Sequence, residues 1–354
     1  MSRFFSEKYS ALSPYTPGEQ PKDKRYIKLN TNESPFPPSP LALRMAGKAA
    51  EDLQLYSDPE CRDLMAAAAE IFGLEKEEIL FSNGSDEILN FAFMAFCDEK
   101  HPAVFPDVSY GFYPVFAALN HVPYREIPLK EDFSVDHRDY VGAGGTIFLA
   151  NPNAPTGLAL TVAEIEAIVQ GNPDNVVVID EAYVDFGAES AVELIHRYDN
   201  LLVIQTFSKS RSLAGARLGM GMGCRELIRD LNTIKYSTNP YNINCMTMAA
   251  GIGALRDKEY FEQNCRTIRE NRAWTASALE GLGFTVLPSK ANFLFARHER
   301  ADGKALYLKL KEMGILVRHF DKERLRDYNR ITIGSMEQMQ ALTEALRQIL
   351  EEKP

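Results

Sequence analysis

Short apolar runs recur through the middle of the chain, and segments with a helical pattern separate them. The runs cover residues 103–105, 146–150, 176–179 and 201–204, and the last two contain only Val, Ile and Leu. Continuous apolar runs of this length are typical of strands that are buried on both faces of a parallel sheet. The chain is therefore predicted to adopt an α/β fold with a mostly parallel sheet.

Helical patterns of polar and apolar residues complete this prediction. They fall at 41–72 with a break at 55–59, 87–96, 225–233, 246–255 and 258–282. Beyond Gly283 short strands are predicted at 285–286, 293–295, 315–318 and 331–333, with helices at 304–313 and 336–351. We therefore predict an extended arm over 1–40, a large domain over 41–255 and a smaller α+β domain over 256–354.

Composition excludes several classes of protein. The 354 residues carry a formal net charge of −10, which argues against a nucleic-acid-binding surface, because such surfaces are basic. The cysteines and histidines lack the spacing of a disulfide framework or a metal site, so we expect no bound metal. The first residues lack a hydrophobic signal core, and no apolar run could span a bilayer, so we expect a cytoplasmic protein without membrane contact.

Three polar residues with catalytic potential follow predicted strands at a regular spacing. Asn151 and Asp180 are 29 residues apart, and so are Asp180 and Lys209. One βαβ unit has about 30 residues, so each of the three would close one strand of a single sheet. Ligands of open α/β sheets bind at this edge. Lys209 is thus a candidate imine-forming amine, and Asp180 is a candidate acid beside it.

Other segments supply groups that could bind a phosphate at the same edge. Gly84, Ser85 and Asp86 lie where a helix is predicted to begin, and the free N–H groups of a helix N-terminus bind phosphate well. Hydroxyl groups and a guanidinium near the lysine come from Thr206, Ser208 and Arg217. Two prolines and a glycine within 151–157 predict a rigid turn, with a cis X-Pro bond as one form of it.

These residue types fit a pyridine aldehyde cofactor that carries a phosphate. Such a cofactor needs a lysine for its aldehyde and a carboxylate at its ring nitrogen, because the protonated ring withdraws electrons. It also needs a donor at its ring hydroxyl, an aromatic face and a phosphate site. In that order, the sequence offers Lys209, Asp180, Tyr183, Tyr110 and the groups just named.

Eight segments, in this order along the chain, resemble the motifs of a known family. They are 29–35, 82–87, 151–157, 180–183, 208–209, 216–219, 240–244 and 330–334. The chain resembles the fold-type I, pyridoxal-phosphate-dependent aminotransferases of the aspartate aminotransferase superfamily, and within them the histidinol-phosphate aminotransferases. The resemblance implies a mostly parallel, seven-stranded sheet between helices, and a smaller α+β domain.

The resemblance also implies a role for each matching residue. Lys209 would hold pyridoxal 5'-phosphate and carry the proton that moves during the reaction, while Asp180 would pair with the ring nitrogen and Tyr183 with the ring oxygen. Tyr110 would stack on the ring. The phosphate would be surrounded by Gly84, Ser85, Asp86, Thr206, Ser208 and Arg217. Tyr56 would reach the cofactor of a partner subunit, which implies a homodimer. The residues expected to face the substrates are Tyr15, Asn32, Asn242, Arg318 and Arg330.

The chain departs from the family pattern at two positions. The family usually has Asn before Pro-Thr-Gly, where it contacts the ring oxygen, but this chain has Ala154. Asn153, one residue earlier, is expected to take that contact. Three residues separate the ring-stacking Tyr110 from Pro106, so Phe112 and Tyr113 are alternatives to it.

The implied reaction transfers an amino group between histidinol phosphate or imidazole acetol phosphate and L-glutamate or 2-oxoglutarate, in histidine biosynthesis. Its substrates are therefore a small-molecule amino donor and a phosphorylated keto compound. Decarboxylation of threonine phosphate and transamination of aromatic amino acids are alternatives within the same fold. An alternative of another class is a regulator that keeps the fold but has lost catalysis, although such a protein would be expected to lose Lys209.

Overall fold

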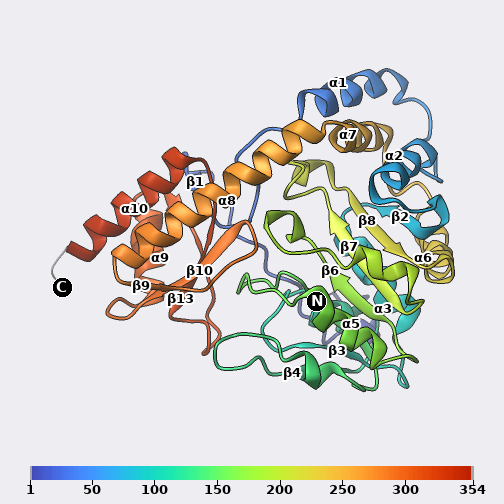
Figure 1. The fold of residues 1–354 in the computed structure, drawn as a ribbon, viewed down its shortest axis with the longest axis horizontal. Coiled ribbons are helices and arrows are strands. Elements are labelled where there is room, and N and C mark those ends of the chain that lie inside the picture. Colours follow the sequence, from blue (N-terminus) through green and yellow to red (C-terminus); the bar gives the residue numbers. More distant parts are fainter. Residues whose placement is uncertain (1, 352–354) are drawn as a thin grey trace.

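A seven-stranded sheet forms the centre of the larger domain. The computed structural model describes residues 2–351. The sheet has the strand order β2-β8-β7-β6-β5-β3-β4 (Figure 1), and only β8 runs antiparallel to its neighbours. Its strands are β2 (Ile79–Ser82), β3 (Ala103–Pro106), β4 (Tyr124–Ile127), β5 (Thr146–Ala150), β6 (Val177–Asp180), β7 (Leu201–Thr206) and β8 (Gly219–Gly223). The predicted α/β fold with a mostly parallel sheet is confirmed.

Both faces of this sheet are apolar and are covered by helices. Along β6, Val177 and Ile179 belong to one core and Val178 to the other, because successive side chains of a strand point to opposite faces. The two layers of helices explain why the central strands are uninterrupted apolar runs. The helices are α1 (Pro40–Ala49), α2 (Arg62–Phe72), α3 (Ser85–Phe96), α4 (Tyr113–Leu119), α5 (Val162–Gln170), α6 (Arg225–Thr238) and α7 (Cys245–Arg256).

The smaller domain has its own core. Its antiparallel sheet has the order β12-β13-β10-β9, and α8 runs from this domain to α7 in the larger one (Figure 1). Its elements are α8 (Lys258–Gly281), β9 (Phe284–Val286), β10 (Phe293–His298), α9 (Gly303–Glu312), β11 (Ile315–Leu316), β12 (Arg318–His319), β13 (Tyr328–Thr332) and α10 (Met336–Glu351). Within the arm, β1 (Ile27–Lys28) pairs in parallel with β11. The exact domain limits, 41–255 and 256–354, stay predictions.

Short 3-10 helices lie in the connections, and three of them, η4, η5 and η6, contribute buried side chains. They are η1 (Glu7–Tyr9), η2 (Ala50–Asp52), η3 (Lys76–Glu78), η4 (His137–Tyr140), η5 (Val184–Phe186), η6 (Val192–His196) and η7 (Ala214–Ala216). Within residues 2–351, no helix combines the length and the apolar character that a bilayer crossing requires.

The register of the sheet brings the ends of three strands together. Ala150 pairs with Asp180, and Asp180 pairs with Ile204, so β5, β6 and β7 end side by side. The segments that follow these strands therefore share one edge of the sheet. This placement is the one expected from the regular spacing of Asn151, Asp180 and Lys209.

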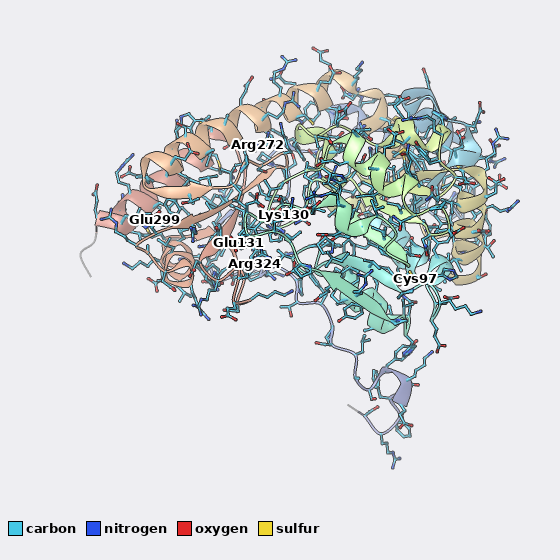
Figure 2. The ribbon with its side chains drawn as sticks, turned by 60° about the horizontal axis from the view of Figure 1, so that its bottom comes forward. Cys97, Lys130, Glu131, Arg272, Glu299 and Arg324 are labelled. Atoms are coloured by element: carbon cyan, nitrogen blue, oxygen red, sulfur yellow. The ribbon has the colours of Figure 1, made fainter. Side chains whose placement is uncertain are left out.

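An arginine of the smaller domain holds a loop of the larger one. Arg324 Nη1 donates to the carbonyl oxygen of Leu129 at 3.0 Å, and Nη2 donates to that of Lys130; Figure 2 labels Lys130 and Arg324 close together between the domains. The guanidinium also lies 4.7 Å from the ring centroid of Phe133. These contacts fix the two domains beside each other.

Helices α1 and α7 approach each other unusually closely at Gly253. A Cβ atom at this position would lie 2.5 Å from the Cα of Ala42, and main-chain atoms cannot move aside without shifting the helix. Gly47, on α1, has no atom within 4 Å of the corresponding position. The two glycines thus differ in packing but not in their helical setting.

We expect Gly253→Ala to destabilise the protein by about 1–3 kcal/mol, because the added methyl group pushes α1 away from α7. Gly47→Ala is the matched control, and it should stabilise by up to about 1 kcal/mol, because alanine favours the helix. Urea denaturation of both variants measures the difference. Equal stabilities would contradict the role of Gly253.

Candidate active site

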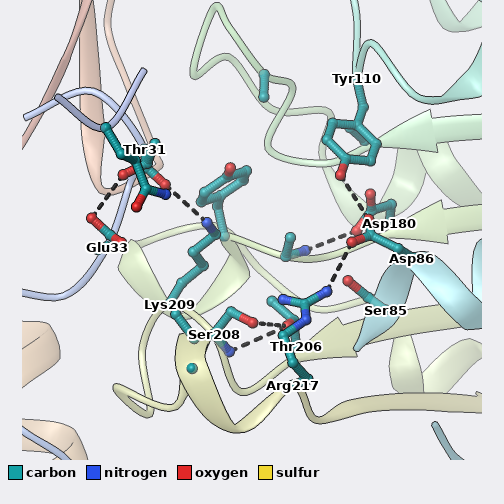
Figure 3. Close-up of a pocket in the computed structure, with 17 residues that line it drawn as sticks. Thr31, Glu33, Ser85, Asp86, Tyr110, Asp180, Thr206, Ser208, Lys209 and Arg217 are labelled. Carbon is teal, nitrogen blue, oxygen red and sulfur yellow. Dashed lines mark hydrogen bonds and ion pairs between the residues drawn. The ribbon is translucent and has the colours of Figure 1, made fainter. Parts of the chain in front are cut away.

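A pocket of about 380 Å³ lies at the shared edge of β5, β6 and β7. Figure 3 shows Lys209, Asp180, Tyr110 and Arg217 around it. A second cavity of about 710 Å³ adjoins this pocket, and the two share the lining residues Thr31, Tyr110, Ala154, Tyr183 and Lys209. We refer to them as the inner pocket and the outer cavity.

Lys209 projects into the inner pocket from the turn that follows β7. The backbone N–H of Ser208 donates to Thr206 Oγ1 at 3.2 Å, which shapes this turn. Lys209 Nζ donates to the carbonyl oxygen of Thr31 at 3.2 Å (Figure 3) and lies 5.8 Å from the ring centroid of Tyr183. The amine is therefore held at the boundary between the inner pocket and the outer cavity.

Asp180 is the last residue of β6, and only 5% of it is exposed. Its Oδ1 accepts the N–H of Ala182 at 3.2 Å, and its Oδ2 accepts the hydroxyl of Tyr113 at 3.4 Å. Burial raises the pKa of Asp180 to about 7, and the negative charge of Asp86 acts in the same direction. A buried carboxyl group of this kind is suited to bind a cationic group that enters the pocket.

The neighbouring acid, Glu181, has a different setting. Its carboxylate accepts hydrogen bonds from Ser190 Oγ at 2.6 Å, the N–H of Ala191 at 2.6 Å and Gln205 Nε2 at 2.9 Å. Burial raises the pKa of Glu181 to about 7 as well. Because Glu181 has three protein donors and does not line the inner pocket, we assign it to the structure of the turn and Asp180 to the site.

The start of α3 forms a cradle for an anion. Gly84 has φ +82°, and a Cβ atom there would lie 2.5 Å from Arg217 Nη2, so a side chain would fill the space beside the guanidinium. Gly219 is equally constrained, since a Cβ atom would lie 2.3 Å from the backbone nitrogen of Ser85. Thr206 Oγ1 donates to Ser208 Oγ at 3.0 Å, and both residues line the same pocket. Free N–H groups, hydroxyls and a guanidinium together fit a phosphate.

The side chain of Asp86 ties two parts of this site together. Its Oδ1 accepts the hydroxyl of Tyr110 at 2.6 Å, and its Oδ2 accepts Arg217 Nη2 at 3.0 Å (Figure 3). A carboxylate would repel a phosphate, so the group that Asp86 offers to one is its backbone N–H in the first turn of α3.

Tyr110 is the aromatic residue of segment 110–113 that lines the inner pocket. Tyr113 is buried beneath it in the core, and Phe112 stacks on Tyr15 with ring centroids 4.2 Å apart. The geometry therefore favours Tyr110 over both alternatives as the ring that faces a ligand.

The structure does not bring Asn153 to the inner pocket. Its Nδ2 donates to the carbonyl oxygen of Val108 at 3.0 Å and to Thr156 Oγ1 at 3.1 Å, and its Oδ1 accepts the hydroxyl of Ser109 at 2.9 Å. The peptide bonds before Pro152 and Pro155 are both cis, as one form of the predicted turn has them. The turn points Ala154 toward the pocket and leaves Asn153 behind it.

The outer cavity contains four of the five residues expected to face substrates: Tyr15, Asn32, Arg318 and Arg330. Arg330 Nη2 donates to the carbonyl oxygen of Asn30 at 3.1 Å, while its buried Nε has no hydrogen-bond partner. Arg318 donates to the carbonyl oxygens of Thr16 and Pro17 in the arm at 3.3 and 3.4 Å. Two guanidinium groups in one cavity suit anionic substrates.

Asn242 and Tyr56, like Asn153 and Gly84, are not among the residues that line either space. Asn242 is buried and donates to Glu87 Oε2 at 2.5 Å. Tyr56 is 85% exposed and stacks on Tyr241 with ring centroids 4.7 Å apart. Neither reaches the inner pocket of its own chain.

Sequence reasoning missed two partners of the central residues. Thr31 accepts Lys209 through its main chain, so its side-chain type carries no signal, although it lies within the motif 29–35. Tyr113 donates to Asp180, but segment 110–113 has three aromatic residues and the sequence does not show which of them reaches the acid. Across the described part of the chain, residues 2–351, no group of three or more His, Cys, Asp or Glu residues could hold a metal ion.

Comparison with known proteins agrees with this geometry. The family described as aminotransferase class I and II matches residues 24–346. Histidinol-phosphate aminotransferases of Brachyspira hyodysenteriae and Clostridium botulinum are 49% and 46% identical over 352 and 351 residues, 99% of both chains in each case. The crystal structure of histidinol-phosphate aminotransferase from Sinorhizobium meliloti with pyridoxal-5'-phosphate has a TM-score of 0.85 and 26% identity, over 92% of each chain.

Fold, pocket and sequence agreement over nearly the whole length lead to one assignment. The chain belongs to the class I and II aminotransferases, and within them to the histidinol-phosphate aminotransferase family.

Proposed function

We propose that this protein is a pyridoxal-phosphate-dependent transaminase that exchanges an amino group between histidinol phosphate and 2-oxoglutarate. The observation that carries the proposal is the meeting of Lys209, Asp180 and the α3 cradle around one pocket. The names of the relatives at 46–49% identity support the substrate and a place in histidine biosynthesis.

The inner pocket fits pyridoxal phosphate by the chemistry of its groups. The α3 cradle and Arg217 would hold the phosphate, Asp180 the ring nitrogen and Tyr183 the ring oxygen. Tyr110 would cover one face of the ring. When bound, the cofactor withdraws electrons from the carbon that carries the amino group.

The residues of the chain then divide the remaining work. Lys209 provides the amine that holds the cofactor and moves a proton to and from the substrate carbon, and the carbonyl oxygen of Thr31 orients that amine. Asp180 keeps the ring nitrogen protonated by offering it a negative charge. Arg330 and Arg318 bind the anionic groups of the substrates, a carboxylate in glutamate and a phosphate in histidinol phosphate.

We also propose that the enzyme is a cytoplasmic homodimer in which Tyr56 contacts the cofactor phosphate of the partner subunit. Tyr56 is exposed and lies outside the inner pocket of its own chain, which supports a role across an interface. The five cysteines are all free, as in proteins of reducing compartments.

The reaction is tested by adding histidinol phosphate and 2-oxoglutarate to the protein loaded with pyridoxal phosphate. We expect glutamate to form, and Lys209→Ala should reduce its formation by at least about 10³-fold, since the nucleophile is lost. Lys258→Ala, an exposed lysine on α8, is the matched control. Release of CO₂ without any need for 2-oxoglutarate would replace the proposal by phosphothreonine decarboxylation, and a response to aromatic amino acids alone would change the substrate.

Asp180→Asn should melt at a higher temperature than the wild type without cofactor and at a lower temperature with it. The folded pKa of Asp180, about 7, exceeds its ordinary 3.8, so its contribution to stability is complete below pH 3.8 and is lost as the pH rises through 7. Without cofactor, the variant should therefore melt at a higher temperature than the wild type at about pH 8, and the difference should shrink toward about pH 4.

With cofactor, the order should reverse, because only the wild type offers the ring nitrogen a carboxylate. Thermal denaturation at several pH values, with and without pyridoxal phosphate, measures both effects. If the melting temperatures of the two proteins depended on pH in the same way, the raised pKa of Asp180 would be contradicted. If cofactor raised both melting temperatures equally, the pairing of Asp180 with the ring nitrogen would be contradicted.

Tyr56→Phe should weaken cofactor binding by about tenfold, the effect of losing one hydrogen bond to a charged group. Equilibrium titration of cofactor-free protein with pyridoxal phosphate measures the affinity. Tyr124→Phe, at an exposed tyrosine on β4, is the matched control. Unchanged affinity in Tyr56→Phe would argue against the contact across the interface.

A further inference from the structure

Tyr183 is held by a short chain of hydrogen bonds that reaches into the smaller domain. Asn32 Nδ2 donates to the Tyr183 hydroxyl at 3.0 Å, and Thr332 Oγ1 donates to Asn32 Oδ1 at 3.0 Å. Asn32 and Thr332 are 1% and 2% exposed, so water does not compete for these bonds. Thr332 lies on β13, two residues after Arg330.

The hydrogen bonds around Asn32 allow its side-chain amide only one orientation. Its backbone N–H donates to Thr332 Oγ1 at 3.0 Å, so the hydroxyl proton of Thr332 remains for Asn32 Oδ1. Asn292 Nδ2 donates to the carbonyl oxygen of Asn32 at 3.0 Å and fixes the backbone, whose φ is +56°. Asparagine tolerates this left-handed conformation better than most residues. The NH₂ group of the amide must therefore face Tyr183.

This orientation decides where the Tyr183 proton points. A phenolic oxygen that accepts a hydrogen bond on one side keeps its own proton for another acceptor. The inner pocket is the side that remains, and Ala154, which lines the same pocket, has no polar side-chain group to offer there. The charged groups that approach Tyr183 are Lys209 and Arg330, and neither can accept a proton from it while charged.

We propose that Asn32 and Thr332 are positioning residues that make Tyr183 the hydrogen-bond donor to the cofactor's ring oxygen, in a site where Ala154 cannot supply a second donor. The inference assigns Asn32 to Tyr183 rather than to the substrate. It rests on the proposed function, because it concerns the same cofactor.

The proposal predicts a specific change in the bound cofactor. A donor at the ring oxygen stabilises the form with most negative charge on that oxygen, which is the form in which the Lys209 nitrogen has lost its proton. Weakening the donor should therefore raise the pH at which the visible absorption of the loaded enzyme changes. Cofactor affinity should fall at the same time.

Thr332→Val and Thr332→Ser form a matched pair for this test. Valine has the shape of threonine but cannot hold Asn32 Oδ1, so the amide can turn and take the Tyr183 proton for itself. We expect the midpoint of the absorbance change to rise by about one pH unit in Thr332→Val and to stay at the wild-type value in Thr332→Ser. Asn32→Asp, whose side chain only accepts when ionised, should raise the midpoint further.

A second variant distinguishes loss of the hydrogen bond from general misfolding, because a misfolded protein would not recover its wild-type midpoint. Ala154→Asn in the Thr332→Val background adds a new donor beside the ring oxygen and should return the midpoint toward the wild-type value. An unchanged midpoint in both Thr332→Val and Asn32→Asp, with the visible band present, would overturn the relay but leave the proposed function intact. Absence of any visible band in the wild type after addition of pyridoxal phosphate would instead refute the proposed function.

Discussion

The buried carboxyl group of Asp180 is the constraint on which the site depends. A negative charge at this depth is costly without a cation, and its protein neighbours Tyr113 and Ala182 supply only hydrogen bonds. The pocket side, where Lys209 lies, is therefore the side from which a positive charge can stabilise the carboxylate. The parallel register of β5, β6 and β7 makes this arrangement possible, because it gives three adjacent strands a common end, with Lys209 just beyond one of them.

The elements best predicted from the sequence are strands whose burial on both faces requires a run of apolar residues. The patterns at β3, β5, β6 and β7 predict strands because every residue of these strands is buried and most of them are apolar. Pattern alone does not predict β2, β8 or β4. The short strand β2 is buried and mostly apolar, but its sequence is not recognised as that of a strand. β8 is Gly-Met-Gly-Met-Gly, which lacks strand-forming side chains, and three of the four residues of the edge strand β4 are exposed. The predicted strand 315–318 is two strands, since β11 pairs with the arm and β12 with β13.

The sequence predicts a site residue well where its type and its place at a strand end are sufficient. It predicts less well where the direction of the side chain determines whether the residue reaches the pocket. Lys209, Asp180 and Arg217 line the pocket as expected, whereas Asn153 faces away, because successive residues of the turn point in different directions. Asn32 was expected near the substrate, yet its amide is bound to Tyr183 and Thr332. These two pairs are 151 and 300 positions apart in the chain, and no local pattern encodes contacts of that range.

The contact between Arg324 and the loop at Leu129 and Lys130 has a consequence for sequence variation. The guanidinium binds main-chain oxygens of residues 129 and 130, which every residue carries, so these two hydrogen bonds do not depend on the side chains at those positions. Lys130 can therefore change over evolutionary time at little cost to these bonds. Leu129 has less freedom, because its buried side chain packs in an apolar cluster with Phe295 and Tyr328 of the smaller domain. The arginine has no such freedom, because a lysine ammonium is a compact point charge and lacks the planar fork that spans two carbonyl oxygens.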